Sequence, residues 1–115
     1  EIARACYDQE VIAEATVVFV FSGDRERAAG KYEERGYEIY AVQDATIAAT
    51  YAQLAATAEG LGSVWVGAFD PLEISRILNL PSYFVPVAVI PVGYPAEKPS
   101  PRERRPLKEM VKEIR

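Results

Sequence analysis

The stretch AEGLGSVWVGAFDP, residues 58–71, contains the signals that decide the fold of this chain. Gly60 follows an alanine-rich run, and glycine is the usual residue in the left-handed position that ends a helix. The uncharged run SVWVGAF over 63–69 is typical of a buried strand. Asp-Pro at 70–71 is typical of a helix start. The stretch therefore predicts a helix, a strand and a second helix in succession.

The first of these helices is predicted over 43–60. Asp44 is its predicted N-cap, because a carboxylate accepts hydrogen bonds from the amides of the first turn. No charged residue occurs over 45–58, and a helix that is apolar nearly all round lies in a large core or in a subunit interface. A chain of 115 residues has little core in which to bury such a helix. We therefore expect an obligate homodimer.

The second helix is predicted over 70–81. Asp70 is its predicted N-cap, and Pro71 occupies the first helical position, where a missing N–H costs nothing. Glu73 is expected to complete a capping box by bonding back to the backbone of the cap residue. Pro81 is expected to end the helix, because proline cannot continue one.

The remaining segments give a coarser prediction. We expect a helix over 1–14, strands over 16–23 and 83–95, a polar excursion over 24–40, an extended linker over 96–104 and a last helix over 105–115. Pro86 and Pro91 place the last strand at a sheet edge or give it irregular pairing, because proline has no N–H to donate. The excursion is expected to form a short helix that ends at Gly36, and its tyrosines make it a candidate lid.

The composition predicts one domain over 1–115. Half of the residues are apolar, and no apolar run approaches the roughly 18 residues that suggest a membrane span. The chain has no histidine, which excludes Ser-His-Asp and Cys-His catalysis and histidine-ligated metals. Cys6 is the only cysteine and forms no disulfide within the chain, which fits a cytoplasmic location. The chain opens in what reads as the middle of a helix and not with Met, so we expect a further N-terminal segment.

Charge is distributed unevenly along the chain. Residues 96–115 carry a formal charge of +3, whereas residues 1–95 carry −7. An acidic body argues against nucleic-acid binding. Arg102, Arg104 and Arg105 form either a solvated charge run or a phosphate site, since guanidinium groups bind phosphate with two parallel hydrogen bonds.

Gly67 is the glycine that points most clearly to a ligand. It interrupts the predicted strand, where glycine often marks the close approach of another group. The amides of Gly67 and Ala68 lie just before a helix start and would suit an electron-rich ligand edge; simple packing is an equal alternative. The glycines do not match the G-x-G-x-x-G dinucleotide fingerprint, and they follow a helix rather than a strand.

Three blocks of the chain resemble the C-terminal part of the nitroreductase family of FMN-dependent oxidoreductases. They are the helix that ends AEGLGSVWVG, the strand VPVAVIPVGYPAEKP and the basic block RERRPLKEMV, and EATVVFVFSGD resembles the strand before them. The resemblance implies an α+β fold, an α/β/α sandwich with a central, mainly antiparallel sheet. It also implies an intertwined homodimer with FMN at the subunit interface. The family's N-terminal helices, with their Arg/Ser-rich flavin-binding motif, have no match in this chain.

The resemblance also implies the cofactor site. The expected flavin-binding residues are Val66, Gly67, Ala68, Arg102, Arg104 and Arg105. The backbone of the first three is expected along the flavin ring, with the amides of Gly67 and Ala68 at its N5 and O4 edge. The three arginines are candidates for binding the FMN phosphate, and the excursion over 24–40 is expected to line the pocket of the electron acceptor.

The implied function is hydride transfer from NAD(P)H through flavin N5 to a nitroaromatic, a quinone or a similar acceptor. The flavin carries this chemistry, so no residue is assigned a catalytic role, which fits a chain without histidine. One alternative is a nitroreductase-like structural or interaction module without catalysis. Another is the same fold with different flavin chemistry, as in relatives that cleave flavin or dehalogenate.

Overall fold

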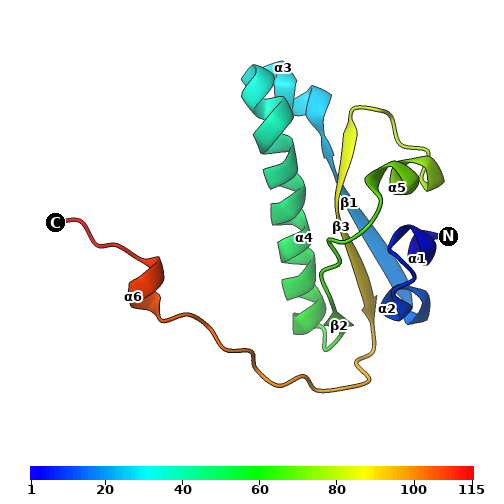
Figure 1. The fold of residues 1–115 in the computed structure, drawn as a ribbon, viewed down its shortest axis with the longest axis vertical. Helices are drawn as coiled ribbons and strands as arrows, with labels where there is room; N and C mark the ends of the chain where they lie inside the picture. Colours follow the sequence, from blue (N-terminus) through cyan, green and yellow to red (C-terminus); the bar gives the residue numbers. More distant parts are fainter.

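The computed structural model describes residues 1–115 as helices on both faces of a small antiparallel sheet (Figure 1). The helices are α1 (Ile2–Ala5), α2 (Glu10–Glu14), α3 (Arg25–Arg35), α4 (Ala41–Ala58), α5 (Pro71–Ile77) and α6 (Leu107–Met110), with the π-helical turn η1 (Gly36–Tyr40) between α3 and α4. The strands are β1 (Val17–Asp24), β2 (Gly62–Ser63) and β3 (Phe84–Gly93). They lie in the order β1-β3-β2, and both outer strands pair antiparallel with β3.

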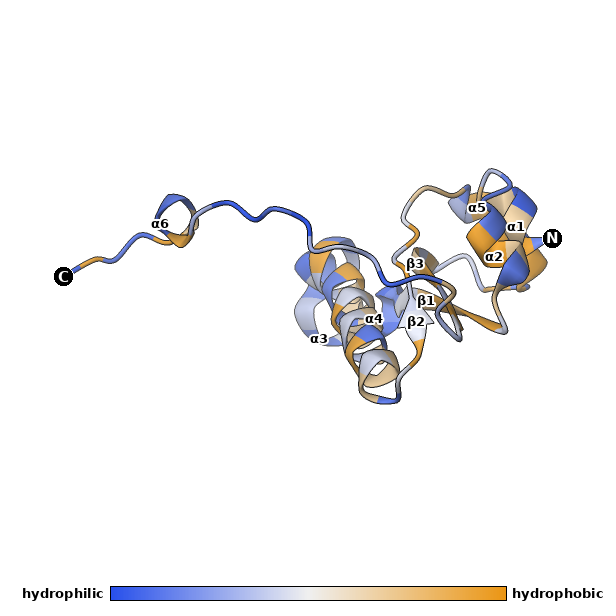
Figure 2. Ribbon diagram, turned by 90° about the horizontal axis from the view of Figure 1, so that it is seen from below, coloured by the Kyte–Doolittle hydropathy of each residue, from blue (hydrophilic) through white to orange (hydrophobic).

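The sheet separates two hydrophobic clusters. The cluster under α4 consists of Ala49, Ala56, Ala88, Ile90 and Val92. The cluster under α1, α2 and α5 consists of Ala5, Cys6, Ile12, Val66, Ile74 and Val89. Figure 2 shows the sheet between α4 on one side and these three helices on the other. The predicted α/β/α sandwich with an antiparallel sheet is therefore confirmed.

β3 is the central strand, so of the two alternatives predicted from its prolines the edge position is wrong. Pro91 explains a gap in its pairing with the segment after β2. β2 and an isolated bridge between Val66 and Val89 pair with β3 in one register. That register would place Val64 opposite Pro91, which has no N–H to donate to it. The chain leaves the ladder at this point. The predicted strand over 63–69 is therefore wrong, and only β2 and the bridge remain.

β1 confirms the predicted strand over 16–23 with a shift of one residue. Its register with β3 shifts between Phe21 and Ser22, where Ser22 pairs with Pro86. The irregular pairing expected from the prolines is therefore present at this end of β3. Val17 and Phe19 on β1 are exposed, so the helices leave part of this strand uncovered.

α4 ends as predicted but begins differently. Gly60 has a φ of +75°, and the amide of Leu61 donates to the carbonyl of Ala56 at 2.8 Å. These features confirm the predicted glycine C-cap. The prediction of Asp44 as N-cap is wrong, because η1 runs directly into α4 through Tyr40, whose backbone is already helical.

The polar excursion folds into two helical pieces that meet at Glu33, where φ is 53° and ψ is −137°. The α-helical part ends at Arg35, one residue before the predicted end. The rings of Tyr32 and Tyr40 meet edge to face with centroids 5.1 Å apart. The guanidinium Nε of Arg35 donates to the Tyr40 hydroxyl at 2.9 Å. Aromatic contacts thus hold the two pieces together.

Both chain ends differ from the sequence prediction. The predicted helix over 1–14 is interrupted at Tyr7 and Asp8, whose φ values are 56° and 54°, and becomes α1 and α2. The predicted helix over 105–115 shrinks to the single turn α6, because its apolar side chains stay exposed and an isolated short helix is marginal in water. The extended linker is confirmed, and residues 94–115, the C-terminal arm, lead away from the body (Figures 1 and 2).

α5 begins as predicted. The carboxylate of Asp70 accepts hydrogen bonds from two first-turn amides at 2.9 and 3.2 Å. The capping box is wrong, since Glu73 pairs with Arg76 at 3.0 Å instead. The helix is followed by Asn79 with a φ of 51°, so it ends before Pro81.

Replacing Asp70 with alanine is expected to lower the free energy of unfolding by about 1 kcal/mol, the usual cost of a lost N-cap. Asp44→Ala is the matched control, because this aspartate also lies in the first turn of a helix but accepts no cap hydrogen bond. Urea denaturation measures both changes. An equal loss of stability in the two variants would contradict the capping role.

Candidate functional site

Residues 67–69, which we call the amide loop, present backbone N–H groups beside the sheet. Gly67 and Ala68 are exposed, and Phe69 is half-buried. None of their three N–H groups donates a hydrogen bond within the chain. The first-turn amides of α5 are taken by Asp70, so the loop itself and not the helix start supplies the free donors. Successive free amides suit an acceptor-rich ligand edge.

The amide loop is held at both ends and in the middle. Val66 exchanges hydrogen bonds of 2.9 and 3.0 Å with Val89, and the N–H of Asp70 donates to α1 at 2.8 Å. The side-chain amide of Gln9 donates to the carbonyl of Ala68 at 3.1 Å. Val66 is only 3% exposed and both of its backbone polar groups are engaged. It therefore anchors the loop, and the next two residues are exposed.

The packing of the chain does not require glycine at position 67. Its φ lies outside the left-handed region, and an added Cβ would meet only the indole of Trp65, at 3.7 and 3.8 Å. At Gly23 and Gly36, by contrast, an added Cβ would overlap the backbone of a neighbouring segment. A glycine that neither conformation nor packing requires is consistent with the close approach of a ligand. Position 67 therefore leaves room for a flat group against the backbone.

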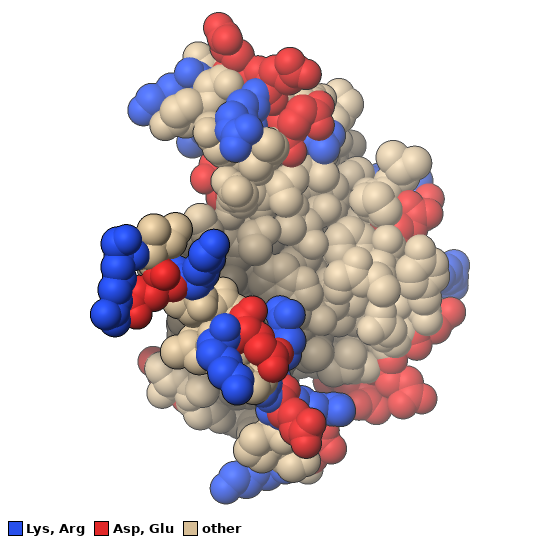
Figure 3. Space-filling view, turned by 60° about the vertical axis from the view of Figure 1, so that its left-hand side comes forward, with Lys and Arg blue, Asp and Glu red and all other residues tan.

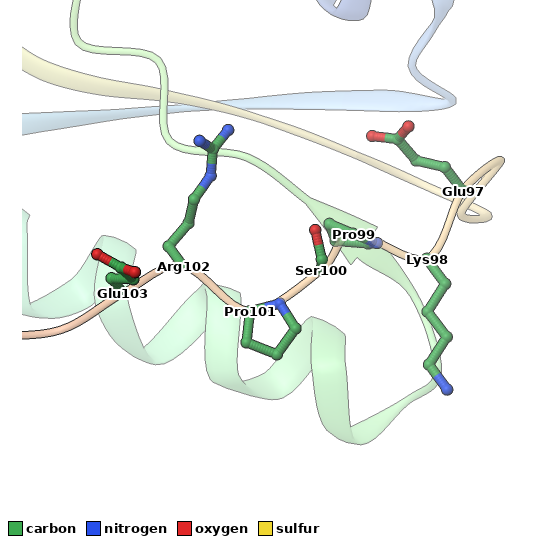
Figure 4. A pocket seen from close by; sticks show the side chains of 7 residues that line it. All are labelled: Glu97, Lys98, Pro99, Ser100, Pro101, Arg102 and Glu103. Atoms are coloured by element: carbon green, nitrogen blue, oxygen red, sulfur yellow. The ribbon is translucent and has the colours of Figure 1, made fainter.

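The predicted arginines lie on the C-terminal arm. Arg102, Arg104 and Arg105 are exposed and make no ion pair or hydrogen bond with the body. Figure 4 shows the hollow along 97–103, in which Arg102 and Lys98 point in opposite directions. Only residues of the arm line this hollow, and a site with a single wall buries little of a ligand. One copy of the chain thus does not bring the arginines to the amide loop.

A second hollow, of about 380 Å³, lies between the excursion and α4. It is lined by Ala28, Tyr32, Tyr40, Gln43, Asp44 and Ile47. This volume lies in the usual range for small-molecule sites, about 300–1,000 Å³. Two tyrosine rings supply aromatic walls, and Asp44 supplies a carboxylate. The assignment of an acceptor pocket to this excursion stays a prediction.

α4 exposes an uncharged side on the face opposite the sheet. Ile47, Tyr51 and Leu54 are 55%, 69% and 62% exposed, and their spacing places them on one face of the helix. Figure 3 shows a broad uncharged area with charged side chains gathered around it. Exposed apolar side chains grouped on one helix face suit an interaction surface. It is the side of the helix that we expect in a subunit interface.

The side chains do not form a reactive thiol site or a metal site. Cys6 is buried, and burial raises the pKa of its thiol, so it remains protonated and unreactive. No three His, Cys, Asp or Glu side chains are grouped so that they could hold a metal ion. None of the helices is both long enough and apolar enough to cross a membrane.

Gln9 contacts the amide loop, and it was not among the residues predicted for the site. Its contact with Ala68 joins positions that are 59 residues apart. Nothing in the local sequence CYDQE indicates such a contact, because no short-range pattern pairs a glutamine with a distant carbonyl. Only the packing of α1 and α2 beside the amide loop reveals it.

The fold and the site define a class of protein. It is an α+β sandwich in which a short irregular segment beside the central strand carries main-chain N–H groups with no acceptor within the chain. The chain belongs to the nitroreductase family, whose model matches residues 2–94.

Individual relatives agree with this membership. The FMN reductase (NAD(P)H) of Bacillus subtilis is 31% identical over a region that covers 92% of this chain and 48% of that protein. The NADH dehydrogenase of Thermus thermophilus is 44% identical over 53% of this chain and 30% of that protein. The solved structure of NfrA1 from B. megaterium is similar with a TM-score of 0.84 at 27% identity, covering 97% of this chain and 51% of that one. The chain spans about a third to a half of the length of the curated relatives that it matches.

Proposed function

We propose that this chain is part of an FMN-dependent oxidoreductase that transfers hydride from NAD(P)H to a nitroaromatic, a quinone or a similar acceptor. The observation that carries the proposal is the amide loop, with free N–H groups next to a glycine that the fold does not require. Family membership supplies the chemical context. FMN, when bound, would supply N5 as the atom that accepts and returns the hydride.

The chain's own contribution would be binding and electrostatics. The N–H groups of Gly67 and Ala68 would donate to acceptor atoms at the N5 and O4 edge of the ring. Fixed donors stabilise negative charge on the reduced ring without reorganising. The excursion hollow, with Tyr32 and Tyr40, would receive the acceptor. No side-chain acid or base is needed for hydride transfer by a bound flavin. The cytoplasmic location stays a prediction.

A second copy of the chain would complete the site. The exposed uncharged side of α4 suits burial against another copy, since a two-fold dimer buries the same patch on both subunits. The arm carries Arg102, Arg104 and Arg105 away from its own body, and its apolar residues Leu107 and Ile114 are 70% and 84% exposed. Both features favour an arm that packs on a partner and brings arginines to the FMN phosphate there.

The first test is FMN uptake by the purified protein. We expect a yellow protein whose colour is bleached by NAD(P)H. Trp65, the only tryptophan of the chain, lies beside Gly67, so its fluorescence should be quenched as FMN binds. A colourless protein whose Trp65 emission does not respond to FMN would contradict the proposal.

The double variant Arg104→Ala/Arg105→Ala is expected to weaken FMN binding by at least about 100-fold, because each of the two charge-assisted hydrogen bonds contributes about 1.5–3 kcal/mol. Lys108→Ala/Lys112→Ala removes the same charge from the same arm and should leave FMN affinity unchanged. Fluorescence titration measures affinity, and light scattering measures the oligomeric state. Loss of the dimer by the arginine variant, in a protein that never binds flavin, would instead support the structural module.

A further inference from the structure

The side-chain amide of Gln9 joins two carbonyl groups that are far apart in the sequence. Its Nε2 donates to the carbonyl of Cys6 at 2.9 Å and to the carbonyl of Ala68 at 3.1 Å. A primary amide has two N–H donors, so both bonds form at once. Gln9 thereby ties the turn between α1 and α2 to the middle of the amide loop.

The bond to Ala68 fixes the direction of a loop amide. A peptide bond is planar and trans, so the C=O of Ala68 and the N–H of Phe69 point in opposite directions. Because Gln9 holds the carbonyl, the N–H of Phe69 points away from Gln9. The side chain of Phe69 packs against the cluster under α1, α2 and α5, which restrains the residue further.

The remaining anchors restrain only the outer peptide groups. Val89 holds the carbonyl of Val66 and so directs the N–H of Gly67, and the bond from the Asp70 N–H to Ala5 directs the carbonyl of Phe69. Between them, the peptide groups that join residues 67–69 could turn, because Gly67 has wide backbone freedom. The bond from Gln9 to Ala68 is the one hydrogen bond that any backbone group of residues 67–69 makes within the chain.

We propose that Gln9 is the positioning residue of the amide loop: by holding the peptide group of Ala68 and Phe69, it keeps the neighbouring N–H of Ala68 in the arrangement that receives the flavin edge. The flavin part of this inference rests on the proposed function, whereas the restraint of the loop rests on the hydrogen bonds alone. Donors that are held in place before binding lose less conformational entropy when the ligand arrives. They also remain directed at the ring when it gains negative charge.

The test compares Gln9→Met with Gln53→Met. Methionine keeps the length of glutamine and removes its donors, and Gln53 is a matched control because its amide donates to Ser63 Oγ, at 3.3 Å, away from the loop. In the ligand-free protein, the backbone order parameters of residues 67–69 should fall from about 0.85 to below about 0.6 only in Gln9→Met. The FMN dissociation constant should rise about fivefold. The midpoint potential of bound FMN should become more negative.

Two results would overturn the positioning role of Gln9. Unchanged order parameters at 67–69 overturn the inference, and so does an unchanged flavin potential in a variant that is merely less stable, because that pattern indicates only a role in the turn between α1 and α2. If the protein takes up no FMN at all, the proposed function fails, while the order parameters still decide whether Gln9 restrains the loop. Gln9→Glu, which places oxygen against two carbonyl oxygens, serves as a second variant if Gln9→Met does not fold.

Discussion

Replacing Gly36 with alanine is expected to lower the free energy of unfolding by about 3 kcal/mol, the upper part of the usual range for overpacking. Gly36 is buried where the excursion folds back on itself after Glu33. An added Cβ would overlap the carbonyl oxygen of Ala28 and lie 2.6 Å from its carbonyl carbon. These are backbone atoms, so a helix and not a flexible side chain would have to move. Urea denaturation measures the loss.

Gly30→Ala is the matched control for this variant. Gly30 lies in α3, and an added Cβ there meets nothing within 4 Å. Alanine should therefore raise the free energy of unfolding by about 0.5–1 kcal/mol, because glycine is a poor helix former. The two substitutions are chemically identical, but their effects on the free energy of unfolding should have opposite signs. Similar effects at both positions would show that the close approach to Ala28 does not constrain the fold.

Replacing Gly67 with valine is expected to weaken FMN binding by about 100-fold while leaving the stability of the ligand-free protein nearly unchanged. Within the chain the Cβ of the new side chain would meet only the indole of Trp65, at ordinary contact distance. Towards a ligand it would add bulk where the ring must approach the backbone. Overpacking of this kind costs about 1–3 kcal/mol, and 2.7 kcal/mol corresponds to about 100-fold in affinity.

A graded series sharpens this test. Gly67→Ala should fall between the wild type and Gly67→Val in affinity, because a single methyl group obstructs the ring less. Gly30→Ala, far from the loop in sequence and free of clashes, should bind FMN as the wild type does. Fluorescence titration of Trp65 gives the affinities. Wild-type affinity in Gly67→Val would remove Gly67 from the proposed site.

The parts of the fold that depend on local chemistry could be predicted from the sequence. Gly60 ends α4 and Asp70 begins α5, because each acts through its own backbone conformation or on amides two or three residues away. Asp44 failed as a cap because the preceding turn, η1, already continues the helix, and a π-helical turn has no clear sequence signal. The predicted strand over 63–69 was wrong because the pairing of Val64 depends on Pro91, which lies in another strand.

In the candidate site, too, features that depend on local sequence could be predicted, and those that depend on packing could not. The sequence singled out Gly67 and Ala68, because a glycine interrupts an apolar run there, but it left simple packing as an equal alternative. The role of Gln9 could not be predicted, because it depends on how α1 and α2 pack beside the loop. The short α6 also follows from long-range effects, since the apolar stripe predicted over 105–115 finds no covering surface within the described chain.

Pro91 interrupts the ladder just before the bridge that anchors the amide loop. An N–H at this position could bond to Val64, and the ladder could then close without interruption from β2 to the Val66 bridge. Residues 62–66 would then form one continuous strand. Without that donor, the Val66 bridge is a single pair that joins residues 67–69 to β3. A loop on one short attachment depends on further contacts for its conformation, and the bond from Gln9 to Ala68 is such a contact.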